Sequence, residues 1–349
     1  MEKRTELEEL GEFGLIERLT SKIKLNNPST ILGVGDDAAL LNYKDKLVVV
    51  STDALVEGIH FDLTYTPLKH LGYKCCIVNF SDIFAMNAFP KQITITISAS
   101  NRFSVEAIEE LYSGIYLACQ EYGVDIIGGD TTSSTSGLFI SISVIGEVES
   151  DKVVKRSGAK QHNLICLSGD IGAAYAGLLV LEREKATFKA NPNFQPDFSS
   201  YEYVLERQLK PKAQKEIISW LNKNNILPTS MIDLSDGLAS EILHICRKSD
   251  VGCEIYLEKL PIDYQTNRTF EEMKINPDVG ALNGGEDYEL LFTIDQKDYE
   301  KIKENKDISI IGHITDKTMG ENLITPQNTA ITIRAQGWNH YKKEENKDE

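Results

Sequence analysis

Six apolar runs along the chain end in an acid that stands among glycine, serine or threonine. The segments are ILGVGDDAAL, VVVSTDAL, IIGGDTTS, CLSGDIG, MIDLSDGL and NGGEDYELL. An acid that follows a strand commonly caps the next helix, and this interpretation is sufficient for any single copy. We keep it for Asp170, which precedes the helical pattern IGAAYAGLL. Several such acids in one chain favour another chemistry, because carboxylates hold Mg²⁺ together with substrate phosphates.

Asp82 is the most informative single acid. It stands inside the apolar segment VNFSDIFAM, which has the spacing of a helix. A carboxylate on the apolar side of a helix is costly to bury unless it is paired or coordinates a metal. We therefore interpret Asp82 as a metal ligand, with solvent exposure or an ion pair as the alternative.

Other devices for phosphate or hydrolytic chemistry are absent from the sequence. There is no G-x-x-x-x-G-K-[ST] loop, no H-R-D followed by D-F-G, and no G-x-S-x-G elbow. The six histidines lack zinc spacing. The formal net charge of −16, without a basic run, argues against nucleic-acid binding. An acidic protein that handles phosphates needs cations, which again favours Mg²⁺.

The elements that must position these acids form two α/β blocks. The 349 residues predict two domains, 1–150 and 151–340, followed by a disordered tail, 341–349. In the first block, strands are expected at 47–55 and 92–100, and a helix is expected to be capped by Ser104 and to end at Gly123. The six cysteines lack paired spacing, so we expect buried reduced thiols. Without a signal segment or an apolar run of membrane length, we expect a cytoplasmic protein.

Nine ordered motifs resemble those of the thiamine-monophosphate kinase family, within the superfamily of aminoimidazole ribonucleotide synthetase and selenophosphate synthetase. They are GEFGLIERL, GVGDDAAL, STDALVEGIHF, VNFSDIFAM, IGGDTT, KRSGAK, IDLSDGL, NGGEDYELLFT and GWNHY, and they span nearly the whole chain. Two departures stand out: Asn87 replaces a usual glycine, and Ser133-Ser134 replaces an arginine found in some members, so the ATP site is expected to depend more on Arg156.

The resemblance implies a fold and an activity. The fold is α/β (α+β), with an N-terminal mixed sheet that binds ATP and metal and dimerises into a barrel, and a C-terminal α/β domain. The activity is direct in-line transfer of a phosphoryl group from ATP to thiamine monophosphate, assisted by several Mg²⁺ ions, in a homodimer. The acceptor is already an ionised phosphate, so we assign no catalytic base or nucleophile.

The resemblance also implies roles for individual residues. The metal ligands would be Asp36, Ser51, Thr52, Asp53, Asp82, Asp130, Asp233 and Asp236. ATP would contact Tyr112, Gly129, Asp130, Arg156 and Ser235. Thiamine monophosphate would contact His60, Glu286 and Trp338.

Two other functions are compatible with the same residues. One is an ATP-using member of the superfamily that acts on a different acceptor, such as an amide. The other is a metal-binding relative without turnover. The sequence does not determine the number of Mg²⁺ ions, the kinetics, the role of the insert 191–200, or which subunit supplies each side of the site.

Overall fold

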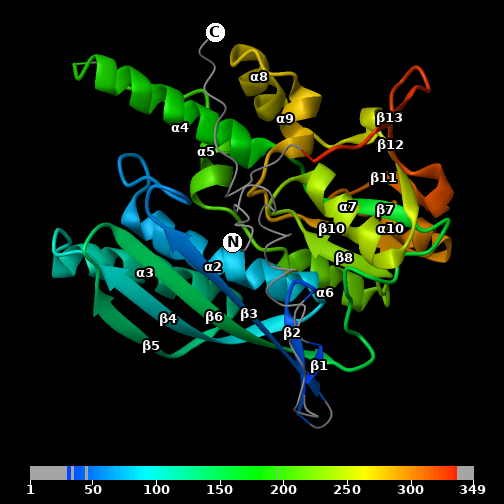
Figure 1. Ribbon diagram of the computed structural model, residues 1–349, viewed down its shortest axis with the longest axis horizontal. Coiled ribbons are helices and arrows are strands. Elements are labelled where there is room, and N and C mark those ends of the chain that lie inside the picture. The colour runs from blue at the N-terminus through cyan, green and yellow to red at the C-terminus, as the bar shows by residue number, and fades with distance from the viewer. Residues whose placement is uncertain (1–29, 33–34, 44–45, 194, 336–349) are drawn as a thin grey trace, which may run out of the picture.

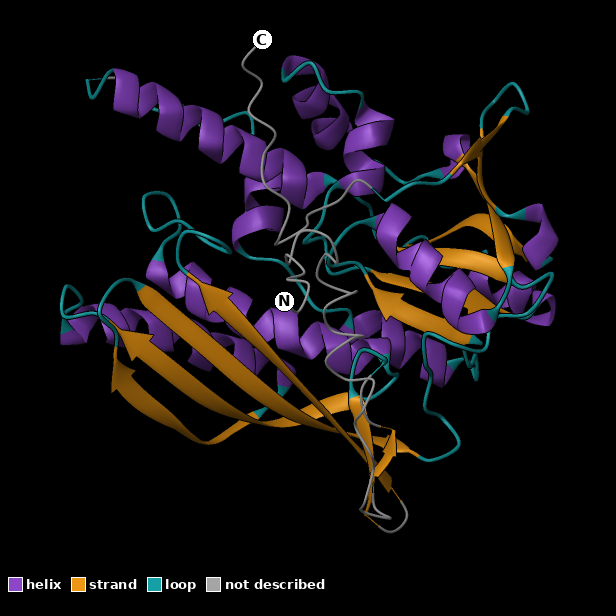
Figure 2. Cartoon of the chain, in the orientation of Figure 1, coloured by secondary structure: helices purple, strands orange, loops and turns teal. Residues whose placement is uncertain are grey.

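The computed structural model describes residues 30–32, 35–43, 46–193 and 195–335 (Figure 1). It contains two mixed sheets with helices between and around them (Figure 2). The predicted α/β class is therefore confirmed. In the described residues, no helix is long and apolar enough to cross a membrane.

The first sheet lies within residues 30–149 and has the order β1-β2-β3-β6-β4-β5. Its strands are β1 (Thr30–Leu32), β2 (Ala39–Tyr43), β3 (Lys46–Val56), β4 (Phe89–Ala99), β5 (Asp125–Ser133) and β6 (Leu138–Glu149). All neighbours are antiparallel except β4 and β5, which run parallel. Within one chain the sheet is open, with β1 and β5 at its edges.

The second sheet begins at residue 164 and has the order β13-β12-β9-β11-β7-β10-β8. Its strands are β7 (Leu164–Ser168), β8 (Ser230–Asp233), β9 (Gly252–Tyr256), β10 (Leu290–Ile294), β11 (Ile308–Thr315), β12 (Glu321–Ile324) and β13 (Ala330–Thr332). The two sheets divide near the expected domain boundary at residue 150, which stays a prediction.

The helices fall into three groups. The first group packs on the first sheet and consists of α2 (Leu68–Ala85) and α3 (Val105–Tyr122). The second group follows β7 and consists of α4 (Ala173–Ala190), α5 (Glu202–Leu209) and α6 (Lys215–Lys223). The last group consists of α7 (Leu238–Ser249), α8 (Tyr264–Glu272), α9 (Pro277–Asn283), α10 (Tyr299–Ile302) and the short 3₁₀ turns η1 (Leu257–Lys259), η2 (Gln296–Asp298) and η3 (Lys317–Met319).

The ends of α3 follow the predicted signals. Ser104 accepts a hydrogen bond from the Ala107 N–H, and Gly123 ends the helix in the left-handed conformation with φ 72°. Asn87, just beyond α2, is also left-handed, with φ 56°. Asparagine tolerates this conformation better than most residues, which explains how it can stand where the family usually has glycine.

Helix α2 is the central element of the molecule. It is buried on nearly all sides and contacts β3 and β6 of the first sheet and β8 of the second (Figure 1). One hydrophobic cluster extends from Ile83 and Phe84 of α2 to Leu290 and Phe292 of β10. The six cysteines are buried and unpaired, as predicted.

The two faces of the first sheet differ in character. Helices α2 and α3 cover one face of the sheet (Figure 2). On this face Ile93, Ile95 and Ile97 of β4 and Ile140, Ile142, Val144 and Val148 of β6 are buried. The opposite face is half-buried or exposed in the described part of the chain. Its centre carries the hydroxyl side chains of Thr52, Thr94, Thr96, Ser141 and Ser143, and apolar side chains such as Val48, Val50 and Ile145 flank them. A mixed face of this kind leaves room for a second layer on the sheet.

Candidate metal and phosphate site

Three carboxylates from separate segments meet at the junction of the two sheets. Asp37 precedes β2, Asp82 lies in α2, and Asp233 ends β8. One oxygen of each lies within 4.8 Å of the others. Three hard oxygen donors at this spacing suit a Mg²⁺ ion, which prefers carboxylates and phosphate oxygens.

Serine hydroxyls orient two of these carboxylates. Ser51 of β3 donates a hydrogen bond to Asp82 Oδ2 at 2.5 Å. Ser81, the residue before Asp82, donates to Asp233 Oδ2 at 2.6 Å. Ser81 and Asp82 are adjacent in α2, so the helix links β3 of the first sheet, through Ser51, to the end of β8, through Asp233.

Burial and nearby negative charges raise the pKa values of Asp82 and Asp233. Burial raises the pKa of Asp82 well above its ordinary value, and the charges of Asp53, Asp233 and Asp37 raise it further. Burial, followed by the charge of Asp37, raises the pKa of Asp233 to about 7. The pKa of Asp53 is raised by the same burial. Negative charge here is unfavourable without a cation, and a divalent ion would relieve both effects.

The guanidinium group of Arg156 forms an ion pair with Asp37. Its Nε and Nη2 atoms donate to the two Asp37 oxygens at 2.9 and 2.5 Å. Its backbone N–H donates to Asp36 Oδ1 at 3.1 Å. Burial and the charge of Asp37 raise the pKa of Asp36 to about 6. Asp36 and Asp37 thus share Arg156, while Asp37 also belongs to the three-acid cluster.

The loop after β8 is held by a buried acid of α7. Glu241 Oε1 accepts the backbone N–H of Asp236 at 2.8 Å and the hydroxyl of Ser235 at 3.4 Å. Burial, followed by the charge of Asp236, raises the pKa of Glu241 well above its ordinary value. Sequence reasoning did not single out Glu241, although an acid in the first turn of a helix is a known signal of contacts with the backbone N–H groups at the helix start.

The loop before β10 lies against the loop after β8. The Glu286 N–H donates to the Ser235 carbonyl at 2.8 Å, and Glu286 has φ 66°. Its Oε2 accepts hydrogen bonds from Lys74 Nζ at 3.0 Å and from Gln208 Nε2 at 2.9 Å. The carboxylate is therefore held from α2 and α5 together.

His60 lies in the turn after β3. The Val56 N–H donates to His60 Nδ1 at 3.0 Å, so Nδ1 is the acceptor and the neutral ring carries its proton on Nε2. The bond fixes the orientation of the ring at this end of β3.

Asp130 and Thr52, two of the expected metal ligands, lie on the face of the first sheet that is turned away from α2. Asp130 of β5 pairs in register with Thr96, then Ser141, then Ala54, so it shares the hydroxyl-bearing face with Thr52. Three strand spacings, about 14 Å in all, separate β5 from β3. Asp130 is exposed, and Gly129 has no room for a side chain because an added Cβ would lie 2.0 Å from the Ile95 carbonyl. A single chain does not bring Asp130 to the three-acid cluster.

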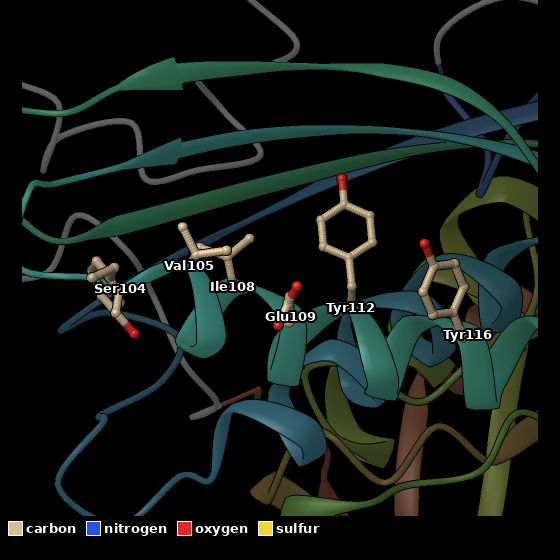
Figure 3. A pocket seen from close by; sticks show the side chains of 7 residues that line it. Ser104, Val105, Ile108, Glu109, Tyr112 and Tyr116 are labelled. Atoms are coloured by element: carbon tan, nitrogen blue, oxygen red, sulfur yellow. The ribbon is translucent and has the colours of Figure 1, made fainter.

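Tyr112 lines a shallow hollow on α3. The hollow has a volume of about 620 Å³ and is lined by Phe103, Ser104, Val105, Ile108, Glu109, Tyr112 and Tyr116. Tyr112 and Tyr116 point to the same side of α3 (Figure 3), with ring centroids 5.9 Å apart. Flat apolar surfaces of this kind suit an aromatic ring.

Known proteins resemble this chain over nearly all its length. The profile described as "AIR synthase related protein, N-terminal domain" matches residues 35–148. The thiamine-monophosphate kinase of Bacillus subtilis (strain 168) is 32% identical, covering 95% of this chain and 100% of its own. That of Buchnera aphidicola subsp. Schizaphis graminum is 36% identical, covering 95% and 99%. The chain belongs to the thiamine-monophosphate kinase family.

A solved structure of the thiamine-monophosphate kinase family has the same fold. AaThiL complexed with AMPPCP and TMP superposes with a TM-score of 0.81 at 30% identity, covering 97% of this chain and 99% of its own. The family resemblance carried by the nine sequence motifs is confirmed.

Several residues that the thiamine-monophosphate kinase motifs imply are gathered by the structure. Around the three-acid cluster lie Asp36, Ser51, Asp53, Asp82, Arg156, Asp233 and Ser235. Asp53 is held by its N–H, which donates to Asn79 Oδ1 at 3.1 Å. Trp338 lies outside the described residues. The metal and substrate roles of all these residues stay predictions.

For two residues, Asp37 and Asp170, the structure differs from the sequence-based interpretation. Asp37 was not among the expected ligands, yet it is the member of the Asp36–Asp37 pair that joins the three-acid cluster. The expected helix cap at Asp170 is wrong. The N–H groups of Gly172 and Ala174 donate to Asp287 at 2.6 and 3.1 Å, and Asp170 accepts the Tyr203 hydroxyl.

Proposed function

We propose that this protein transfers a phosphoryl group from ATP to thiamine monophosphate and forms thiamine diphosphate. The observation that carries the proposal is the three-acid cluster of Asp37, Asp82 and Asp233, set in a chain of the thiamine-monophosphate kinase family. The relative solved with AMPPCP, an analogue of ATP, and TMP supports both substrates.

Magnesium ions are part of the proposal, and the residues present fit them. The cluster offers carboxylate oxygens only, and the pKa values of Asp82 and Asp233 are raised, an effect that a divalent cation would reverse. We propose Asp37, Asp82 and Asp233 as the core ligands, with Asp36, Asp53 and Asp236 beside them. When bound, Mg²⁺ neutralises the negative charge of the phosphate oxygens.

The protein's own groups position the reactants. Ser51 and Ser81 keep Asp82 and Asp233 directed at the cluster, and Arg156 holds Asp37. Tyr112 would support the ATP base, and His60 and Glu286 would bind the thiamine part of the acceptor. Phosphoryl transfer depends mainly on such placement, so the ionised acceptor phosphate attacks in line without a general base.

A second subunit completes the proposed site. Thr52 and Asp130 share the hydroxyl-bearing face of an open sheet, about 14 Å apart by strand spacing. We propose that a second copy packs on this face, closes a barrel, and brings its Asp130 toward Thr52. Exposed β5 and its free edge support this arrangement, because such edges are normally covered.

The test is detection of thiamine diphosphate by mass spectrometry. The protein is incubated with ATP, Mg²⁺ and thiamine monophosphate. Thiamine diphosphate is expected to form with stoichiometric ADP, to disappear with EDTA, and to return when excess Mg²⁺ is added. Unphosphorylated thiamine is the matched control acceptor and is expected to stay unchanged. ADP formation without thiamine diphosphate would instead indicate another acceptor of the superfamily.

A further inference from the structure

Lys74 is a buried lysine in the middle of α2, with 4% of its side chain exposed. Lysine is rarely buried, because the ammonium group loses its hydration, unless a counter-charge and hydrogen bonds replace the water. Both are present here. Lys74 Nζ donates to Glu286 Oε2 at 3.0 Å and to the Gln208 carbonyl at 3.1 Å.

Glu286 uses its two oxygens differently. Both Lys74 and Gln208 Nε2 donate to Oε2, at 3.0 and 2.9 Å. Within the described residues no hydrogen bond reaches Oε1, and 31% of the Glu286 side chain is exposed. One oxygen is thus fixed inside the protein, and the carboxylate plane is set by two donors on the same side.

The backbone of Glu286 is held as well. Its φ of 66° is uncommon for a residue with a side chain, and its N–H is bonded to the Ser235 carbonyl. The neighbouring Gly285 approaches the same carbonyl so closely that an added Cβ would lie 2.3 Å from it. Backbone and side chain together direct Glu286 beside the Ser235–Asp236 loop.

We propose that Lys74 is a positioning residue for the acceptor substrate, acting through Glu286. It fixes Oε2 so that Oε1 faces a hydrogen-bond donor on thiamine monophosphate. It also offsets the charge of Glu286, so recognition depends on the direction of a hydrogen bond rather than on attraction of any cation. This inference rests on the proposed function and on the proposed role of Glu286.

The test separates acceptor binding from the rest of catalysis. Lys74→Met removes the ammonium group and keeps the length of the side chain. The KM for thiamine monophosphate is expected to rise about tenfold or more, the effect of losing an oriented bond to a charged group. The kcat and the KM for ATP are expected to stay within about twofold, because the hydrogen bonds of Lys74 within the described residues go to Glu286 and Gln208 and to none of the proposed metal or ATP ligands. Lys301→Met, in the exposed ion pair with Asp298, is the matched control.

A double-mutant cycle tests whether Lys74 acts through Glu286. In a Glu286→Gln background, Lys74→Met is expected to change the KM for thiamine monophosphate by less than about twofold, since its target is already altered. Full additivity of the two effects would overturn the inference. An equal loss in kcat and both KM values would also overturn it, because that pattern indicates a general structural role.

A second variant and the wild-type protein complete the test. If Lys74→Met does not fold, Lys74→Gln, which keeps a donor and removes the charge, is measured with the same expectations. If the wild-type protein turns over thiamine monophosphate and the variant KM is unchanged, the inference alone fails. If the wild-type protein does not use thiamine monophosphate at all, the proposed function fails and the inference falls with it.

Discussion

At the scale of single residues, the site is a set of like charges held close together by hydroxyl groups. Asp82 is surrounded by the charges of Asp53, Asp233 and Asp37, in a region where water is scarce. Ser51 compensates with one hydrogen bond only. Such an arrangement lowers the stability of the chain without a cation, which agrees with the ligand-binding role proposed for these acids.

The first prediction concerns Asp82. In EDTA, Asp82→Asn is expected to raise Tm by on the order of 2 °C, because the amide carries no charge to bury. Mg²⁺ with AMPPCP is expected to raise the Tm of the wild-type protein and to leave that of Asp82→Asn nearly unchanged. Differential scanning fluorimetry measures both shifts. Exposed Asp151→Asn is the control and should behave as wild type in both buffers; equal Mg²⁺ shifts in all three proteins would contradict a ligand role.

The second prediction concerns Asp37. Asp37→Asn is expected to reduce kcat by at least about a hundredfold, because it weakens both the three-acid cluster and the anchor of Arg156. Asp37→Glu keeps the charge and is expected to recover part of the loss. Steady-state kinetics at several Mg²⁺ concentrations check this, and a wild-type Mg²⁺ dependence in Asp37→Asn would remove Asp37 from the ligand set.

At the scale of elements, α2 and α3 touch through their backbones. An added Cβ at Gly72 would lie 1.9 Å from the Leu111 carbonyl, and one at Gly114 would lie 1.9 Å from the Lys69 carbonyl. Glycines at the crossing let the helices approach closely. The position of α2, which carries Lys74, Asn79, Ser81 and Asp82, is therefore set by its contact with α3.

The third prediction concerns this helix crossing. Gly72→Ala is expected to destabilise the protein by about 1–3 kcal/mol, the usual effect of overpacking a tight contact. It should also lower activity, because α2 must move away from α3 and this movement displaces Asp82 from the three-acid cluster. Ser113→Ala, next to Gly114 but half-buried, is the control and should change stability by less than about 0.5 kcal/mol. Urea unfolding and the kinase assay measure the two effects.

Elements with local signals were predictable, and contacts between distant segments were not. Ser104 and Gly123 were found from the sequence because a helix cap involves neighbours three or four residues away. Asp287 caps α4 from 115 residues further along, so the local signal at Asp170 was misleading. Lys74 and Glu286 are 212 residues apart. The only sequence signal for Lys74 was a charged residue inside an apolar helix, the same signal that singled out Asp82.

The site shows the same division. The repeated strand–acid motifs predicted a set of carboxylates, and the structure brings Asp36, Asp53, Asp82 and Asp233 to one junction; their metal role stays a prediction. They did not distinguish Asp37 from Asp36, since consecutive residues face different directions and the sequence does not specify which one faces α2. Nor did they separate Thr52 from its neighbours Ser51 and Asp53, which the pleat of β3 places on the opposite face.

At the scale of the whole molecule, the proposed second chain would cover the hydroxyl-bearing face of the first sheet. A two-fold contact would use this same face on both copies. It would place Asp130 of each chain near the other chain's β3, where Thr52 lies. Activity would then require two chains.

The fourth prediction uses two inactive variants. Asp82→Asn and Asp130→Asn are each expected to be inactive alone. After co-refolding in equal amounts, about half of the dimers carry one of each chain, and one of their two sites is intact if Asp130 acts in the partner's site. About one quarter of the wild-type activity is then expected. Analytical ultracentrifugation confirms the dimer; no recovery in verified heterodimers would show that each site uses its own Asp130.

The proximity of Asp82 in α2 to Asp233 in β8 couples the stability of the two sheets. A ligand held by both carboxylates can bind only while β8 stays docked on α2. Opening of either sheet therefore releases it, and its binding free energy is added to the cost of opening both. Amide hydrogens in the core of β6 and in β10, far apart along the chain, would then slow their exchange by the same factor when substrates bind. The bound nucleotide would make a two-sheet chain exchange as one cooperative unit.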